Sequence, residues 1–185
     1  MKNGKLIVIS GASGVGKGTV LSLMMQKRDD LFFSVSATTR APRPGEVDGK
    51  HYFFISKECF EEMIKNDEFL EYDAHAANYY GTLRGQAEAK QKQGHVLLDI
   101  EPKGAAQVRK SAPDATLIFI MPPSVEELER RLRGRGDTSE DQIAMRMERA
   151  IWEMEQRTWY DYVVVNDDAQ RCADEILSII SKLED

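Results

Sequence analysis

Short apolar segments alternate with amphipathic segments along most of this sequence. Continuous apolar runs occupy residues 5–10, 95–100 and 115–121, and each run is followed by glycine, proline or an acidic residue. Runs of this length are typical of strands that are buried on both faces of a sheet. We predict further, less regular strands at residues 32–36, 51–55, 69–72 and 162–165.

Helices are predicted between these strands. Ser124 and Glu127 have the spacing of a capping box, which marks the start of a helix, and Gly94 has the position of a residue that ends one. The predicted helices cover residues 20–26, 58–65, 86–93, 104–110, 124–132, 139–158 and 169–183. Strands that alternate with helices indicate an α/β fold with a mainly parallel sheet flanked by helices.

Composition excludes several classes of protein. The 185 residues suit a single domain, and a content of 42% hydrophobic and 30% charged residues is that of a globular chain. With 25 basic and 31 acidic side chains, the net charge is −6, which argues against nucleic acid or an anionic membrane as a partner. Oligomeric state cannot be read from the sequence.

The compartment is also constrained. Cys59 and Cys172 lie far apart and form no CxxC pair, which favours a reducing compartment. No apolar stretch approaches the ~20 residues of a membrane span, and the apolar run after Lys5 is too short for the core of a signal peptide. We expect a cytoplasmic protein.

Residues 11–19 (GASGVGKGT) lie directly between a predicted strand and a predicted helix. This is the spacing of a P-loop, in which backbone N–H groups and the helix N-terminus bind phosphate. Lys17 would provide a cation for the β and γ phosphates of a nucleotide. The P-loop pattern has a hydroxyl residue directly after the lysine. Here Gly18 takes that position and the hydroxyl of Thr19 follows one residue later, which weakens the case for a direct Mg²⁺ ligand. A plain glycine turn is disfavoured in this context, and no dinucleotide-binding GxGxxG pattern fits.

A second anion site is indicated by Arg40 and Arg43, which flank a proline in a polar loop predicted at residues 38–50. Two guanidinium groups and the hydroxyl of Tyr52 could hold a second phosphate. The spacing alone gives equal weight to surface ion pairs of these arginines with Glu46 and Asp48.

Residues 38–55 resemble the guanylate kinase signature T-T-R-x-x-R-x-x-E-x-x-G-x-x-Y-x-F-I, with every position filled. Residues 78–82, 98–101, 131–136 and 164–168 match the same family in the right order. The resemblance covers about residues 6–183 and implies a P-loop nucleoside-monophosphate-kinase fold. It divides the single domain 1–185 into a core (about 1–33, 84–125 and 159–185), a GMP-binding region (about 34–83) and a helical lid (about 126–158).

The resemblance implies an enzyme that transfers the γ-phosphoryl group of ATP, with Mg²⁺, to GMP. The implied catalytic residues are Lys17, Arg131, Arg135 and Arg146. The implied ATP-binding residues are Gly11, Ala12, Ser13, Gly14, Val15, Gly16, Lys17, Gly18, Thr19 and Asn166. The phosphate of GMP would be held by Ser36, Arg40, Arg43, Tyr52 and Tyr80, and its base by Glu71 and Thr82. Asp99 and Glu101 would contact GMP or the waters around Mg²⁺, with the ion near Thr19 and Asp99.

The chemistry of guanine agrees with this assignment. Guanine presents N1–H and N2–H₂ donors side by side, which one carboxylate can accept together, and its O6 needs a donor such as the hydroxyl of Thr82. Adenine has no N1–H and would leave Glu71 without a partner. Sites that hydrogen-bond a substrate in this way discriminate against an analogue without the matching donors by roughly 10⁴-fold or more.

Several alternatives stay open. Asp99 could be a helix cap, and Asn166 could cap the last helix instead of contacting adenine. A solvated basic face explains three other arginines better than a role at the nucleotide does: Arg130, Arg133 and Arg149. Glu101 stands where the family usually has Asp, and its extra methylene would shift a water bound to Mg²⁺. At the level of function, the alternatives are an inert, peptide-binding module of the same fold and a P-loop kinase with another phosphorylated acceptor.

Overall fold

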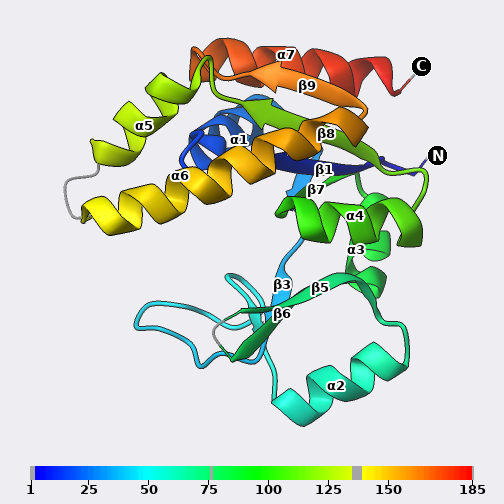
Figure 1. Cartoon of the computed structure of the whole chain (residues 1–185). Helices are drawn as coiled ribbons and strands as arrows, with labels where there is room; N and C mark the ends of the chain where they lie inside the picture. Colours follow the sequence, from blue (N-terminus) through cyan, green and yellow to red (C-terminus); the bar gives the residue numbers. More distant parts are fainter. Residues whose placement is uncertain (1–2, 76, 135–138, 185) are drawn as a thin grey trace. The chain divides into compact units, whose positions relative to one another are not determined.

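The computed structural model describes residues 3–75, 77–134 and 139–184 (Figure 1). The chain divides into two compact units. Unit 1 contains the N-terminal residues up to Val8 and residues Asp30–Thr116, and unit 2 contains Ile9–Asp29 and the chain from Leu117 onward. No helix in this described part of the chain is long and apolar enough to cross a membrane.

The larger sheet has the strand order β2-β7-β1-β8-β9, and β1 contributes to both units. In unit 1, Leu31 of β2 pairs with His95 of β7 in parallel register, and in unit 2, Ile118 of β8 pairs with Tyr162 of β9 in the same sense. β1 is buried along its whole length, as its apolar run predicts. The bounds of the strands are β1 Leu6–Gly11, β2 Leu31–Phe33, β7 His95–Asp99, β8 Thr116–Met121 and β9 Tyr162–Val165.

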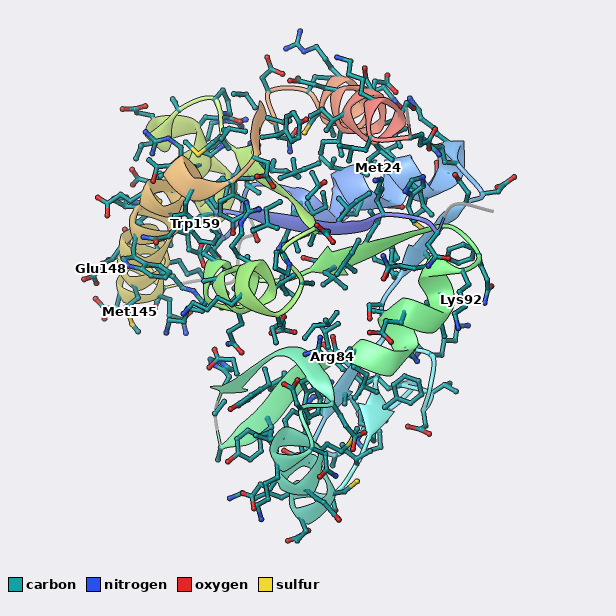
Figure 2. All side chains as sticks on the ribbon, turned by 90° about the vertical axis from the view of Figure 1, so that its right-hand side faces the viewer. Met24, Arg84, Lys92, Met145, Glu148 and Trp159 are labelled. Atoms are coloured by element: carbon teal, nitrogen blue, oxygen red, sulfur yellow. The ribbon has the colours of Figure 1, made fainter. Side chains whose placement is uncertain are left out.

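Helices of unit 2 bury apolar side chains beside this sheet. α1 and α7 pack against each other, and Met24 of α1 and Ile176 of α7 are fully buried. Figure 2 labels Met24 in the interior and Met145 at the outside of α6, where it is exposed. The helices are α1 Lys17–Lys27, α5 Val125–Arg133, α6 Glu140–Glu155 and α7 Ala169–Lys182, and a 3₁₀ helix covers Gln156–Trp159.

Unit 1 carries a smaller, mixed sheet with the order β4-β3-β6-β5. β3 and β4 are parallel, whereas β6 runs antiparallel to both β3 and β5. Its core is aromatic: Phe60 of α2 stacks on Phe69 and on Tyr79, with ring centroids 4.3 and 5.1 Å apart. The elements are β3 Ser36–Thr38, β4 Phe53–Phe54, β5 Phe69–His75, β6 Asn78–Leu83, α2 Lys57–Lys65, α3 Arg84–Gln91 and α4 Pro102–Ser111.

The prediction of one strand at residues 32–36 is wrong, because two strands share this segment. Leu31–Phe33 belongs to the larger sheet and Ser36–Thr38 to the smaller one. Between them, the N–H of Ser34 still donates to the carbonyl of Leu97, but that of Val35 donates to the side chain of Gln86. The chain therefore changes hydrogen-bonding partners within two residues, which periodicity cannot reveal.

Other boundaries also differ. No strand was predicted at Asn78–Leu83, yet this segment is paired on both sides. The strand at 51–55 contracts to Phe53–Phe54, and the long helix ends at Glu155. Gly94 does not cap α3, which ends at Gln91. A Cβ at Gly94 would lie 2.2 Å from the carbonyl oxygen of Asp30, so glycine is needed there for a close approach of two backbone segments. The division into core, GMP-binding region and lid stays a prediction.

Candidate active site

The glycine-rich loop of unit 2 connects β1 to α1, as its sequence predicts. Gly14 and Gly16 have φ angles of 87° and 92°, a left-handed conformation that side chains rarely adopt. Gly16 occupies the N-cap position of α1, and within the described residues no side chain caps this helix. The first N–H groups of α1, which begins at Lys17, are therefore placed to interact with an anion.

Two side chains hold the loop through the carbonyl of Val15. The Nδ2 of Asn166 donates to this oxygen at 2.7 Å, and an N–H of Arg131 donates to it at 3.1 Å. Arg131 also donates to the carbonyl of Asn166 and to Glu127. Asn166 is buried, and the N-cap of α7 is Asp168, so the alternative that Asn166 caps this helix is wrong. The contact of Asn166 with adenine stays a prediction.

A carboxylate that sequence reasoning missed also binds this loop. Glu153 of α6 is 3% exposed, and its Oε2 accepts the N–H of Ser13 at 2.7 Å. Its Oε1 accepts from the Nε of Arg149 at 3.0 Å. Arg149 was interpreted as part of a solvated basic face, and its side chain is exposed, but its partner is a buried acid beside the phosphate loop. The (i, i+4) spacing of these residues was the available signal, but it is common on exposed helix faces.

The other basic residues of this region differ in their surroundings. Arg130 pairs with Glu127, and Arg133 pairs with Glu129 and Glu140, as expected for a solvated face. Arg146 is exposed on α6. Arg135 lies outside the described residues.

In unit 1, the predicted phosphate-binding arginines meet Glu46. Arg40 donates to both carboxylate oxygens of Glu46, at 2.7 and 2.9 Å, and the N–H of Arg43 donates to the same carboxylate at 2.7 Å. These bonds, led by that of Arg40, lower the pKa of Glu46 to about 2. The ion pair expected with Glu46 is thus present for Arg40. Asp48 instead accepts the N–H of Phe54.

Aromatic rings surround the guanidinium of Arg40. Its Cζ lies 5.2 Å from the ring centroid of Tyr52 and 5.7 Å from that of Phe54. Tyr80 packs edge-on to Tyr52, with centroids 6.1 Å apart, and its hydroxyl acts with Glu46 to raise the pKa of Arg40. Arg40, Tyr52 and Tyr80 therefore form one cluster. The side chain of Arg43 is exposed.

Glu71 and Thr82 face each other across β5 and β6. Both are buried, and the hydroxyl of Thr82 donates to Oε1 of Glu71 at 2.6 Å. Burial raises the pKa of Glu71, and the bond from Thr82 opposes this rise. A threonine hydroxyl has one proton, so it cannot donate to Glu71 and to the O6 of a base at once. Ser36 pairs with Thr82 on the other side of β6, which places it beside this pair in the sheet.

Asp99 and Glu101 follow the buried part of β7. Asp99 is the exposed last residue of the strand, and Glu101 occupies the N-cap position of α4. The helix cap is therefore Glu101 and not Asp99. The raised pKa of Glu71 is caused first by burial, and the negative charges of Asp73 and Glu101 add to it.

Comparison with known proteins decides the family. The family model described as guanylate kinase matches residues 3–183. The chain belongs to the guanylate kinase family. A guanylate kinase of Trichormus variabilis is 53% identical over 167 residues, which cover 90% of this chain and 84% of the relative, and one of Synechocystis sp. is 48% identical over 182 residues, covering 98% and 95%.

A solved structure supports the same assignment. The crystal structure of a guanylate kinase from Anaplasma phagocytophilum covers 98% of this chain, and 86% of its own chain is covered, with a TM-score of 0.72 and 32% identity. The predicted class, an α/β P-loop nucleoside-monophosphate-kinase fold, is thereby confirmed.

The first prediction concerns the hold of Glu153 on the phosphate loop. Glu153→Ala leaves the N–H of Ser13 and the charge of Arg149 without this buried acceptor. We expect the free energy of unfolding to fall by about 1–3 kcal/mol, and the affinity for ATP to fall with it because the loop loses an anchor. Urea unfolding and ATP titration measure the two effects. Glu155→Ala, at an exposed position of the same helix, is the control; equal stability and ATP affinity in both variants would contradict the anchoring role.

Proposed function

We propose that this protein is a guanylate kinase that transfers the γ-phosphoryl group of ATP to GMP, giving ADP and GDP, in purine nucleotide metabolism. The observation that carries the proposal is the buried Glu71–Thr82 pair in unit 1, an acceptor arrangement suited to guanine. The relatives' names and the complete phosphate loop support it. They disfavour the inert peptide-binding module, which would not need a phosphate loop.

Recognition of the base rests on an ionised Glu71. A carboxylate accepts only, so it can receive N1–H and N2–H₂ of guanine together. Adenine offers no donor at N1, so this buried charge would receive no hydrogen bond from N1 of the base, which is costly. Thr82 would orient the carboxylate, and its donation to O6 requires that its hydroxyl turn away from Glu71 when GMP binds.

The phosphate of GMP would be bound by the cluster around Arg40. A guanidinium has five N–H donors, and Arg40 directs some of them at Glu46 and at the carbonyl of Ala41, which fixes the plane of the group. Its other donors, the exposed guanidinium of Arg43 and the hydroxyls of Ser36, Tyr52 and Tyr80 would meet the phosphate oxygens.

ATP would be bound in unit 2 by the loop Gly11–Thr19, with Lys17 at its phosphates. Arg131, Arg135 and Arg146 would place positive charge on the phosphoryl group during transfer, and one such arginine is worth roughly 10³-fold or more in rate. Arg131 contacts the loop itself through the carbonyl of Val15, which ties its position to that of the phosphates.

Each unit has an oxygen donor that is suited to magnesium. Mg²⁺ prefers oxygen ligands and keeps several waters. In unit 2 this donor is the hydroxyl of Thr19 in the first turn of α1, and in unit 1 it is the carboxylate of Asp99 at the end of β7. Bound with ATP, the ion would supply charge neutralisation on the phosphates.

The chemical step needs little from the protein beyond position and charge. A phosphate oxygen of GMP, already an anion, attacks the γ-phosphorus of ATP, and the bond from that phosphorus to the oxygen of ADP breaks. No proton has to be removed from the acceptor, so no general base is required. Catalysis therefore consists of alignment and of neutralising charge by Lys17 and the arginines.

The decisive assay compares acceptors. Purified protein is supplied with ATP and either GMP or AMP, and ADP formation is followed. GMP should be phosphorylated with kcat/KM roughly 10⁴-fold above that of AMP. In Glu71→Gln this ratio should collapse, because an amide cannot accept from both guanine donors, while Glu88→Gln on α3 should keep it. Faster turnover with AMP than with GMP would overturn the base assignment.

A pH profile tests the charge state of Glu71. Burial raises its pKa, so the carboxyl takes up a proton at a higher pH than an exposed glutamate does. The protonated form cannot accept two hydrogen bonds. We therefore expect kcat/KM for GMP to fall as the pH is lowered through this raised pKa, at a higher pH than the ionisation of an exposed glutamate would give. The KM for ATP should not follow the same curve; parallel curves for both substrates would contradict the assignment.

Lys17 separates the two nucleotide sites. Lys17→Met removes the cation expected at the ATP phosphates and leaves unit 1 unchanged. Turnover should fall by roughly 10³-fold or more, whereas the affinity for GMP, measured by calorimetry, should stay within about twofold of the wild-type value. A comparable loss of GMP affinity would show that the assignment of the two sites is mistaken.

A further inference from the structure

Helix α4 packs against β5, the strand that carries Glu71. Gly104, Gln107 and Ser111 lie three and four residues apart along α4, and residues with this spacing share one face of a helix. Each of them meets β5 at Glu71 or at one of its neighbours, Leu70 and Tyr72. The position of the base-reading carboxylate is thus connected to α4 at several points.

Gly104 leaves space for the carboxylate itself. A Cβ at this buried position would lie 2.8 Å from Oε2 of Glu71 and 3.3 Å from its Cδ. The other carboxylate oxygen, Oε1, accepts from Thr82 at 2.6 Å. The carboxylate therefore has Gly104 on one side and Thr82 on the other, and a side chain at 104 would displace it relative to Thr82.

Gln107 and Ser111 fix the backbone on both sides of Glu71. The side-chain amide of Gln107 accepts the N–H of Tyr72 at 3.1 Å and donates to its carbonyl at 2.8 Å, and the hydroxyl of Ser111 donates to the carbonyl of Leu70 at 2.7 Å. β5 is the edge strand of the smaller sheet. Among the described residues no strand pairs with its outer backbone groups, and side chains of α4 supply hydrogen-bonding partners instead.

We propose that Gly104 and Gln107 are positioning residues that set the selectivity for the 2-amino group of the base. Together they hold Glu71 so that both guanine donors reach its carboxylate at once. The inference rests on the proposed function. A displaced carboxylate can keep its contact with N1–H of the base more easily than it can keep the contacts with N1–H and with the 2-amino group together. Displacement therefore reduces the advantage of GMP over IMP, the 6-oxopurine nucleotide that lacks the 2-amino group.

The test measures KM and kcat for GMP, and the inhibition constant of IMP against GMP, in Gly104→Ala. We expect the KM for GMP to rise roughly tenfold or more, since small displacements of a binding group are costly, while the inhibition constant of IMP changes by less than about threefold. The kcat and the KM for ATP should change little. Gly85→Ala on α3 is the matched control, because a Cβ there meets open space.

A merely structural role gives a different result. If Gly104→Ala weakens GMP and IMP by the same factor, or weakens neither, the proposal is overturned. If this variant does not fold, as judged by thermal unfolding, Gln107→Ala decides with the same measurements. Gln93→Ala, at an exposed position, is its control. Gln107→Ala should also raise the KM for GMP more than it weakens IMP, and equal losses would again reject the proposal.

The outcome with Glu71→Gln separates this inference from the function on which it rests. Suppose that this variant loses the preference for GMP over IMP, while Gly104→Ala and Gln107→Ala keep that preference. Glu71 then reads the base without help from α4, and only the inference fails. If Glu71→Gln keeps the preference for GMP, the base assignment in the proposed function fails.

Discussion

The Glu71 carboxylate is buried beside the hydroxyl of Thr82, and burying an acid is unfavourable unless it finds partners. In this structure Thr82 binds the carboxylate, but burial still raises the pKa of Glu71, so the charged form is disfavoured. A ligand with two adjacent donors would stabilise that charge. The proposed selectivity for guanine follows from this demand, and the surrounding elements of unit 1 serve to keep the carboxylate in place.

Positive charge in this acidic protein is held in defined orientations by glutamates. Glu46 accepts hydrogen bonds from both terminal nitrogens of Arg40, and Glu127 accepts one from Arg131. Such pairs keep a planar guanidinium in one orientation before a ligand arrives, which lowers the entropy lost on binding. The remaining donors of each group can then meet phosphate oxygens. The net charge of −6 is therefore compatible with binding two anionic nucleotides.

Much of the fold was predictable because its main strands are continuous apolar runs. The three strands β1, β7 and β8 were located to within one residue at every boundary, and the strand at Tyr162–Val165 was predicted with its observed bounds. β6 was missed because its sequence, NYYGTL, combines polar residues and a glycine with aromatic ones. The phosphate loop was evident from its own spacing, whereas Glu71 was identified only through the family resemblance.

The residues that support the site were beyond the reach of the sequence. Glu153 has the pattern of an exposed helical acid, and its contact with Ser13 joins positions 140 residues apart. Gly104 looks like an ordinary helical glycine until the side chain facing it is known. Both depend on which surfaces meet in the folded chain, and local periodicity carries no information about that.

The bond between Glu153 and the loop also limits which amides could meet a polyphosphate. The amide of Ser13 donates to a carboxylate oxygen, and that of Val15 donates to the carbonyl of Ala12. The same carboxylate would repel a phosphoryl group placed beside Ser13. If ATP binds at this loop as proposed, its phosphates would therefore lie toward Gly16 and the first turn of α1.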